Sequence, residues 1–114
     1  MSAEDNIHAD SSIEEEVLNM KVSFFKAMAD QTRLQILEKL VTEKEMNVSE
    51  MCKAIGKDQS SISHHLACLR NCGLVRTKKN GKFIVYMLNG YENIADFLAI
   101  ADHHARELLP CRRV

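Results

Sequence analysis

Residues 47–73 read NVSEMCKAIGKDQSSISHHLACLRNCG, and this stretch decides the fold. Asn47 or Ser49 can cap a short helix, and Gly56 suits the left-handed position that follows a helix end. After a tight turn, a longer helix with a polar front is expected over residues 59–71. A short helix, a tight turn and a longer helix form the helix-turn-helix pattern.

A hairpin is predicted directly downstream. Two runs with strand character, 74–79 and 82–88, flank the dipeptide Asn80-Gly81. Asn-Gly between such runs is the strongest short signal for a β-hairpin, which here would form a wing. A last helix is expected over 92–109, and Pro110 should break it.

Two more helices are expected upstream. Residues 1–11 are acidic and predicted to be disordered, and Ser11 or Ser12 can cap a first helix that runs to about residue 29. Asp30 would cap a second helix over 31–42. The predicted fold is mainly α with a small β-hairpin wing, a winged helix-turn-helix in the order α-α-α-α-β-β-α.

The predicted domain covers residues 12–109, between the acidic N-terminus and a tail at 110–114. The 114 residues allow one small core. The first and last helices carry more apolar surface than such a domain can cover, so a homodimer is expected.

Composition favours a cytoplasmic protein. No apolar run approaches the roughly 20 residues that a membrane span needs, so no membrane partner is expected. The N-terminus lacks the basic and apolar regions of a secretory signal. Thiols stay reduced in the cytoplasm, so the four cysteines are expected to be free, metal-binding or redox-active.

The net charge of −1 conceals a basic segment, because residues 57–82 carry six bases and one acid. A solvated charged face is the simplest interpretation, but the helix-turn-helix and basic hairpin together favour phosphate binding. An enzyme is not expected, because the adjacent Ser63 and His64 have no oxyanion loop or third partner. The predicted DNA-contacting residues are Gln59, Ser60, Ser61, Ser63 and His64 of the longer helix, Arg70 at its end, and Lys78, Lys79 and Lys82 of the wing.

Cys68 and Cys72 lie four residues apart on the flank of the longer helix. Side chains at this spacing are neighbours, with Cβ atoms roughly 6 Å apart, so two sulfurs can converge on one soft metal ion. Buried free cysteine is also common and inert, and that interpretation stays open. Cys111 follows the predicted helix break, in a tail that needs no role in the core. Cys52 is expected in the core.

The chain resembles the ArsR/SmtB family of winged-helix repressors over about residues 17–109. The resemblance rests on three segments: AMADQTRLQIL at 27–37, DQSSISHHLACLRNCGLV at 58–75 and NGKFIVY at 80–86. Within the last helix only His104 and Glu107 match half of the site used by zinc, cobalt and nickel sensors. Asn47 and Ser49 stand where arsenic and cadmium sensors of another type have cysteines.

The segment HLACLRNCGLV at 65–75 is similar to the CmtR-type cadmium/lead sensors. This resemblance implies Cys68 and Cys72 as two metal ligands and Cys111 of the other protomer as the third. It implies a metal-free dimer that binds double-stranded operator DNA and is released by Cd(II) or Pb(II). Zn(II), Hg(II) or As(III) could use the same thiolates, and a repressor that responds to thiol oxidation or persulfide remains the alternative.

Overall fold

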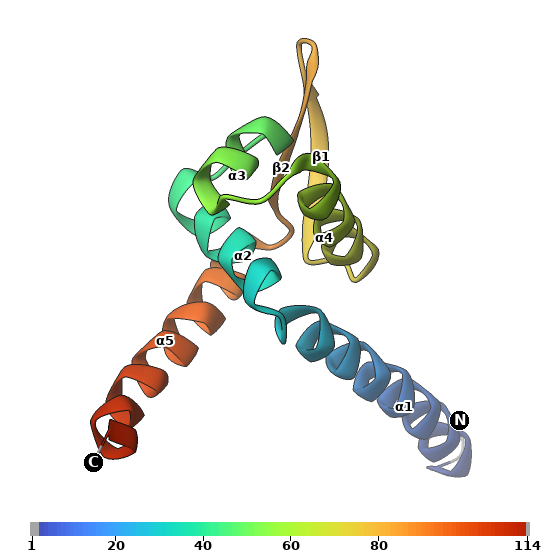
Figure 1. Cartoon of the computed structure of the whole chain (residues 1–114). Coiled ribbons are helices and arrows are strands. Elements are labelled where there is room, and N and C mark those ends of the chain that lie inside the picture. The colour runs from blue at the N-terminus through green and yellow to red at the C-terminus, as the bar shows by residue number, and fades with distance from the viewer. Residues whose placement is uncertain (1–2, 114) are drawn as a thin grey trace.

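Helices and one hairpin follow in the predicted order in this computed structural model, which describes the backbone of residues 3–113 and the side chains of residues 12–112 (Figure 1). The fold is a winged helix-turn-helix, and the predicted order of elements is confirmed. The elements are α1 Ala3–Met28, α2 Gln31–Glu43, α3 Val48–Ile55, α4 Gln59–Asn71, β1 Val75–Asn80, β2 Phe83–Leu88 and α5 Tyr91–Arg113.

The core lies between α2, α3, α4 and the base of the hairpin. Apolar side chains recur at helical spacing on α2 and α4, so each of these helices presents one continuous stripe to the interior. Complete burial of these side chains supplies most of the driving force for folding. The fully buried large side chains are Ile36, Leu37, Leu40, Met51, Ile62, Leu66 and Leu69.

Caps at two helix starts fix the helix-turn-helix. Asn47 Oδ1 accepts the Glu50 backbone N–H at 2.8 Å, and Glu50 Oε1 accepts the Asn47 N–H at 2.9 Å, which completes a capping box on α3. Gly56 ends α3 at a φ of +78°. Asp58, in the turn before α4, caps this helix by accepting the Ser61 N–H at 2.8 Å.

The wing is an antiparallel pair in which Asn80 lies opposite Phe83. The two-residue turn is therefore Gly81-Lys82, one position later than predicted. Gly81 has a φ of +63°, and Lys82 is not among the residues with positive φ. A glycine at the first central position fits a type II′ turn better than the Asn-Gly type I′ turn.

The joint after α2 is strained. Lys44 has a φ of +72° and a ψ of −53°, and the Glu45 N–H donates to the Glu43 carbonyl at 2.9 Å, which makes a rare γ-turn. The Lys44 ammonium lies 3.7 Å from the centroid of the Tyr91 ring. Met46 then forms a bridge with Tyr86 of the wing, so this joint links α2, the wing and α5.

Two predicted helix ends are wrong. α1 begins at Ala3 rather than near Ser12, so residues 3–11 are helical instead of disordered. No glycine or proline interrupts the sequence up to Met28, and acidic residues favour a helix start. α5 continues through Pro110 to Arg113, because a proline this close to a helix end removes one hydrogen bond of the last turn. Residues 1, 2 and 114 of the predicted ends lie outside the described backbone.

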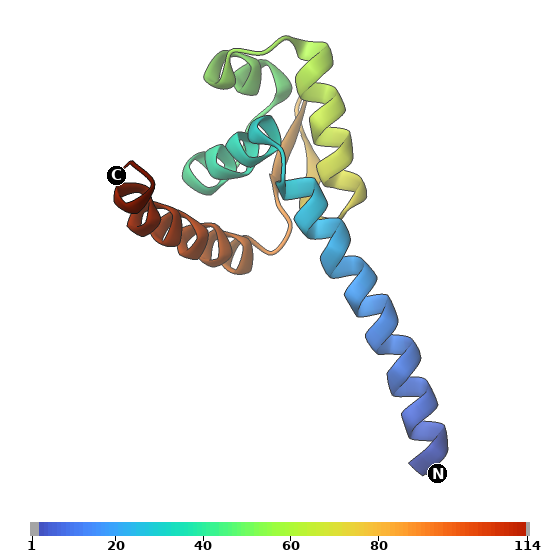
Figure 2. The same cartoon turned by 60° about the horizontal axis from the view of Figure 1, so that its bottom comes forward.

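α1 and α5 project from the core as two arms (Figures 1 and 2). The radius of gyration is 17.7 Å, well above the about 13 Å of a compact domain of this length. The arms meet near their bases, where the rings of Phe25 and Phe97 lie 5.7 Å apart. Among the described residues, no helix is long and apolar enough to cross a membrane.

Candidate nucleic-acid interface and thiol pair

The N-terminal half of α4 presents the predicted polar front. Gln59, Ser60, Ser63 and His64 are exposed, as DNA contact requires. Ser61 is half-buried, and its backbone N–H is held by the Asp58 cap. This cap stabilises the first turn of α4, which carries these side chains.

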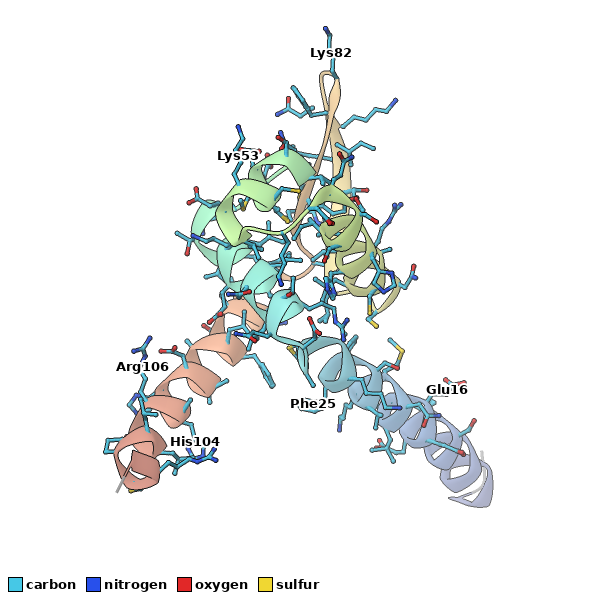
Figure 3. All side chains as sticks on the ribbon, viewed as in Figure 1. Glu16, Phe25, Lys53, Lys82, His104 and Arg106 are labelled. Carbon is cyan, nitrogen blue, oxygen red and sulfur yellow. The ribbon has the colours of Figure 1, made fainter. Side chains whose placement is uncertain are left out.

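The wing carries the predicted lysines, but they differ in their surroundings. Lys82 stands at the wing tip and points away from the body of the protein (Figure 3). Lys78 Nζ lies 2.6 Å from Glu45 Oε1. Among the described side chains, Lys79 and Lys82 have no ion pair of this kind. Arg70 is exposed at the last turn of α4.

Cys68 and Cys72 lie together at the C-terminal end of α4, where both are half-buried. Cys72 is the C-cap residue of the helix. Burial raises the pKa of the Cys72 thiol, and the adjacent Cys68 thiol raises this pKa further. A metal ion that binds Cys72 must therefore displace a proton from this thiol at neutral pH.

Arg33 connects this flank of α4 to the corner between α1 and α2. Its Nε donates to the Ala27 carbonyl at 2.6 Å, and its Nη1 lies 3.3 Å from Nδ1 of His65. Asp30 accepts the backbone N–H of Arg33 at 3.0 Å, which is the main cause of the lowered pKa of Asp30. The guanidinium also opposes the rise in the pKa of Cys72.

Sequence reasoning gave Arg33 no role. Its signal was the Asp-x-x-Arg spacing of Asp30 and Arg33, which puts a cap and a cation on the first turn of α2. The contact with His65 spans 32 positions, so only the fold reveals it.

Among the described side chains of one chain, no third metal ligand joins Cys68 and Cys72. Cys111 is exposed near the end of α5, and Figure 1 shows α5 running away from α4. Among the described side chains, no group of three His, Cys, Asp or Glu is arranged to hold a metal ion. Cys52 is half-buried and packs against the core, as expected.

The polar side chains of α5 pair with one another. His103 Nε2 lies 3.0 Å from Glu107 Oε1, and Arg106 Nε lies 2.8 Å from Asp102 Oδ2. His104 points away from Arg106 on the other side of the helix (Figure 3). This half of a possible second metal site has no partner group among the described residues of the chain.

An apolar groove of about 390 Å³ separates the bases of α1 and α5. Phe24 and Phe25 line one side, and Ile94 and Phe97 line the other. The groove reaches Gly73, the residue directly after Cys72. The end of α4 that carries the thiols therefore borders this apolar groove.

Comparison with known proteins identifies the family. Residues 30–77 match the sequence profile described as "Bacterial regulatory protein, arsR family". A cadmium resistance transcriptional regulatory protein, the CadC homologue of Staphylococcus aureus, is 34% identical over 84 residues, which cover 74% of this chain and 69% of that protein. This chain belongs to the ArsR family. Its relatives CadC and KmtR are named as transcriptional regulators.

Two further relatives support this assignment. The transcriptional regulator KmtR of Mycobacterium tuberculosis is 45% identical over 67 residues, 59% of this chain, and the match spans about half (51%) of that protein's length. The solution structure of the homodimeric winged helix-turn-helix domain Mb0332 from Mycobacterium bovis has a TM-score of 0.77 and 30% identity. It covers 84% of this chain and 87% of that one.

Proposed function

We propose that this ArsR-family protein is a homodimeric repressor that leaves its operator when a soft metal ion binds its thiols. Cd(II) or Pb(II) is the inducer, Cys68 and Cys72 of one subunit are two ligands, and Cys111 of the partner subunit is the third. A regulator of bacterial promoters works in the cytoplasm, where these thiols stay reduced.

The DNA-facing surface consists of the front of α4 and the wing. The polar side chains at the start of α4 contact base edges, and Lys79 and Lys82 contact phosphates. Each subunit supplies one α4, so the operator is expected to have two related half-sites. The exposed apolar side chains of α1 and α5, including Leu18 and Ile100, supply the surface that a second subunit would bury.

The observation that carries the proposal is the pair of adjacent sulfurs on the helix that reads DNA. Thiolates select large, soft cations, and three of them without a nitrogen donor suit Cd(II) and Pb(II). Zn(II) prefers four ligands in a structural site, so it would need an additional donor. The groove that a second subunit would fill ends beside Cys72, which supports delivery of the third sulfur by the partner subunit.

A route from the thiols to the dimer runs through Arg33. A ligand that draws Cys68 and Cys72 toward another subunit moves the flank of α4 that His65 shares. Because Arg33 also holds the Ala27 carbonyl at the end of α1, this movement changes the angle between α4 and the dimer helices. Regulation of this kind requires a coupling free energy of about 1–3 kcal/mol, and DNA must weaken metal binding by the same factor.

The test is a titration of the reduced dimer with Cd²⁺, followed by the ultraviolet absorption of thiolate-to-metal charge transfer. The absorption should be lost in Cys68→Ser, Cys72→Ser and Cys111→Ser. It should remain in Cys52→Ser, the matched control, because that thiol belongs to the core. In parallel, fluorescence anisotropy of a labelled duplex selected by the protein should show release on adding Cd²⁺.

Two outcomes would overturn the proposal. If DNA binding is equally tight with and without Cd²⁺ or Pb²⁺, these metals do not control the protein. Release by a mild oxidant in the presence of a chelator, with no response to metal, assigns the thiols to redox sensing. A bond between Cys68 and Cys72 is not the expected product, because Cα atoms at this helical spacing lie about 6.2 Å apart, at the upper end of disulfide geometry.

A further inference from the structure

Lys44, in the strained joint after α2, adopts a backbone conformation that suits glycine. Among the described residues other than glycine, only Lys44 has a positive φ, of +72°. A glycine would adopt this turn without strain, whereas a residue with a Cβ does so only where the surrounding structure holds it. Strain of this kind is concentrated at functional sites. The conformation of Lys44 therefore points to a role for its side chain.

The side chain of Lys44 holds the start of α5. Its ammonium lies 3.7 Å from the centroid of the Tyr91 ring, where the electrons of the ring attract a cation. Tyr91 is the first residue of α5, and its hydroxyl donates to the Val41 carbonyl in the last turn of α2 at 2.7 Å. One aromatic side chain therefore fastens the start of α5 to the end of α2 by two contacts.

The other side of the joint is attached to the wing. The Met46 N–H donates to the Tyr86 carbonyl at 3.1 Å, and the Met46 carbonyl accepts the Tyr86 N–H at 2.8 Å. Met46 is buried, and Tyr86 lies within β2. Only two residues separate the end of β2 from the start of α5. The wing and α5 are therefore connected twice, along the chain and across the joint.

The angle between the wing and α5 matters in the proposed dimer. The two elements leave the core in different directions (Figure 1). A dimer formed through α1 and α5 fixes the orientation of α5, so the angle at the joint determines where each wing stands. Binding to two half-sites requires both wings at a matching angle. A contact that holds this angle therefore favours DNA binding without touching DNA.

We propose that Lys44 and Tyr91 are positioning residues for DNA binding, because their contact locks the angle between the wing and α5. When the contact is removed, the wing samples several angles, and the apparent affinity for DNA falls with the fraction of molecules in the competent one. The inference rests on the DNA binding in the proposed function and is independent of the metal response.

The test compares variants that keep or remove the cation above the ring, with metal-free, reduced protein. Lys44→Gly removes the ammonium and suits the turn, and Lys44→Arg keeps a cation. A cation–π contact at an exposed site corresponds to about two- to fivefold in affinity for each subunit. Lys44→Gly should therefore bind a duplex selected by the wild type more weakly by this factor, whereas Lys44→Arg should bind it almost as tightly as wild type does.

Two controls separate positioning from a loss of charge. Lys39→Gln makes the same charge change at an exposed residue of α2 and should bind as wild type does. The salt dependence of Lys44→Gly should be unchanged, because a lost phosphate contact would flatten its slope by about 0.9 per subunit. In a Tyr91→Leu background, Lys44→Gly should cause no further loss, because the two residues act through one contact. Melting temperatures check that each variant is folded.

A spectroscopic readout follows the wing directly, without DNA. Tyr86 and Tyr91 are the two tyrosines of the chain, so protein labelled with fluorotyrosine gives one fluorine resonance from the wing and one from α5. The variants Tyr86→Phe and Tyr91→Phe assign them. In Lys44→Gly the Tyr86 resonance should shift or broaden, because the wing samples several angles. In Lys44→Arg it should stay at its wild-type position.

Several results would overturn the proposal. They are wild-type affinity of Lys44→Gly, a flattened salt slope in this variant, an equal loss of affinity in Lys39→Gln, or additive effects of Lys44→Gly and Tyr91→Leu. An unchanged Tyr86 resonance in Lys44→Gly would also overturn it. If the wild type selected no duplex at all, the proposed function would fail, and the fluorine resonances would still decide whether the joint couples the wing to α5.

Discussion

Neutralising one acid on the body of the protein should tighten DNA binding. Glu45 Oε1 lies 2.6 Å from Lys78 Nζ, so this lysine is held by the protein in the absence of DNA. In Glu45→Gln the ammonium becomes free to contact a phosphate. We therefore expect Glu45→Gln to bind DNA more tightly than wild type, with a steeper dependence on salt.

The magnitude follows from the number of lysines released. Each additional phosphate contact steepens the plot of log affinity against log salt by about 0.9, so two subunits add about 1.8. Between 50 and 200 mM salt, Glu45→Gln should lose about tenfold more affinity than wild type does. The ion pair is partly exposed, so its loss should change the free energy of unfolding by less than about 1 kcal/mol.

Fluorescence anisotropy of a labelled duplex at five salt concentrations measures the slope. Glu43→Gln is the matched control, because it makes the same charge change at an exposed residue without this ion pair. The double variant Glu45→Gln/Lys78→Gln should return to the wild-type slope. If Glu45→Gln and Glu43→Gln gave the same slope, Lys78 would already contact DNA in the wild type, and the reasoning would be refuted.

The other predictions concern stability and thiol chemistry. Leu66→Ala, in the buried stripe of α4, should lower the free energy of unfolding by about 2–5 kcal/mol in urea denaturation, and an unchanged midpoint would argue against the packing described. Lys44→Gly should be more stable than Lys44→Ala by about 1 kcal/mol, because only glycine tolerates the positive φ; equal melting temperatures would contradict the strained turn. Because the pKa of Asp30 is lowered in the folded protein, its carboxylate stabilises the fold above the ordinary carboxyl pKa, and this stabilisation is lost as the pH falls. In Asp30→Asn the free energy of unfolding, measured from pH 3 to 7, should therefore depend less on pH. The raised pKa of Cys72 predicts that affinity for Cd²⁺ falls with decreasing pH and that protons are released on binding. Calorimetry in buffers of different ionisation enthalpy measures this proton release, and a binding enthalpy independent of the buffer would contradict the prediction.

Local sequence signals predicted most of the fold. Asn47, Gly56 and Asp30 each act within one helical turn of their own position, so their effects can be read without knowing the fold. The same holds for the core stripe of α4, where Ile62, Leu66 and Leu69 recur at helical spacing. These signals placed α2, α3, α4 and both strands within about one residue of their bounds.

The errors arose where a local preference competes with its context. Pro110 does disfavour helix, but near a terminus it removes only one hydrogen bond, and the helix continues. Asn80-Gly81 favours a turn, but the pairing of Asn80 with Phe83 moves the turn to Gly81-Lys82. The register of a hairpin depends on which faces are buried, and the local dipeptide does not record this.

Part of the candidate site was beyond sequence reasoning because it depends on distant contacts. The proximity of Cys68 and Cys72 follows from helical spacing, and it was predicted. The contact of Arg33 with His65 and the pairing of Lys78 with Glu45 join residues from different elements. Only the folded structure shows that Lys78 of the wing is already paired with Glu45 and that Arg33 contacts His65 on the flank of α4.

Because α1 is long, a small change in its angle at the Arg33 corner produces a large displacement of its far end. The helix has 26 residues, and at 1.5 Å per residue it extends about 39 Å from its anchor. A tilt of about 5° at that anchor would swing the far end through about 3 Å, close to the rise of one base pair. Under the proposed mechanism, a ligand that loosened the Arg33 guanidinium would shift the two α4 helices of the dimer relative to the DNA.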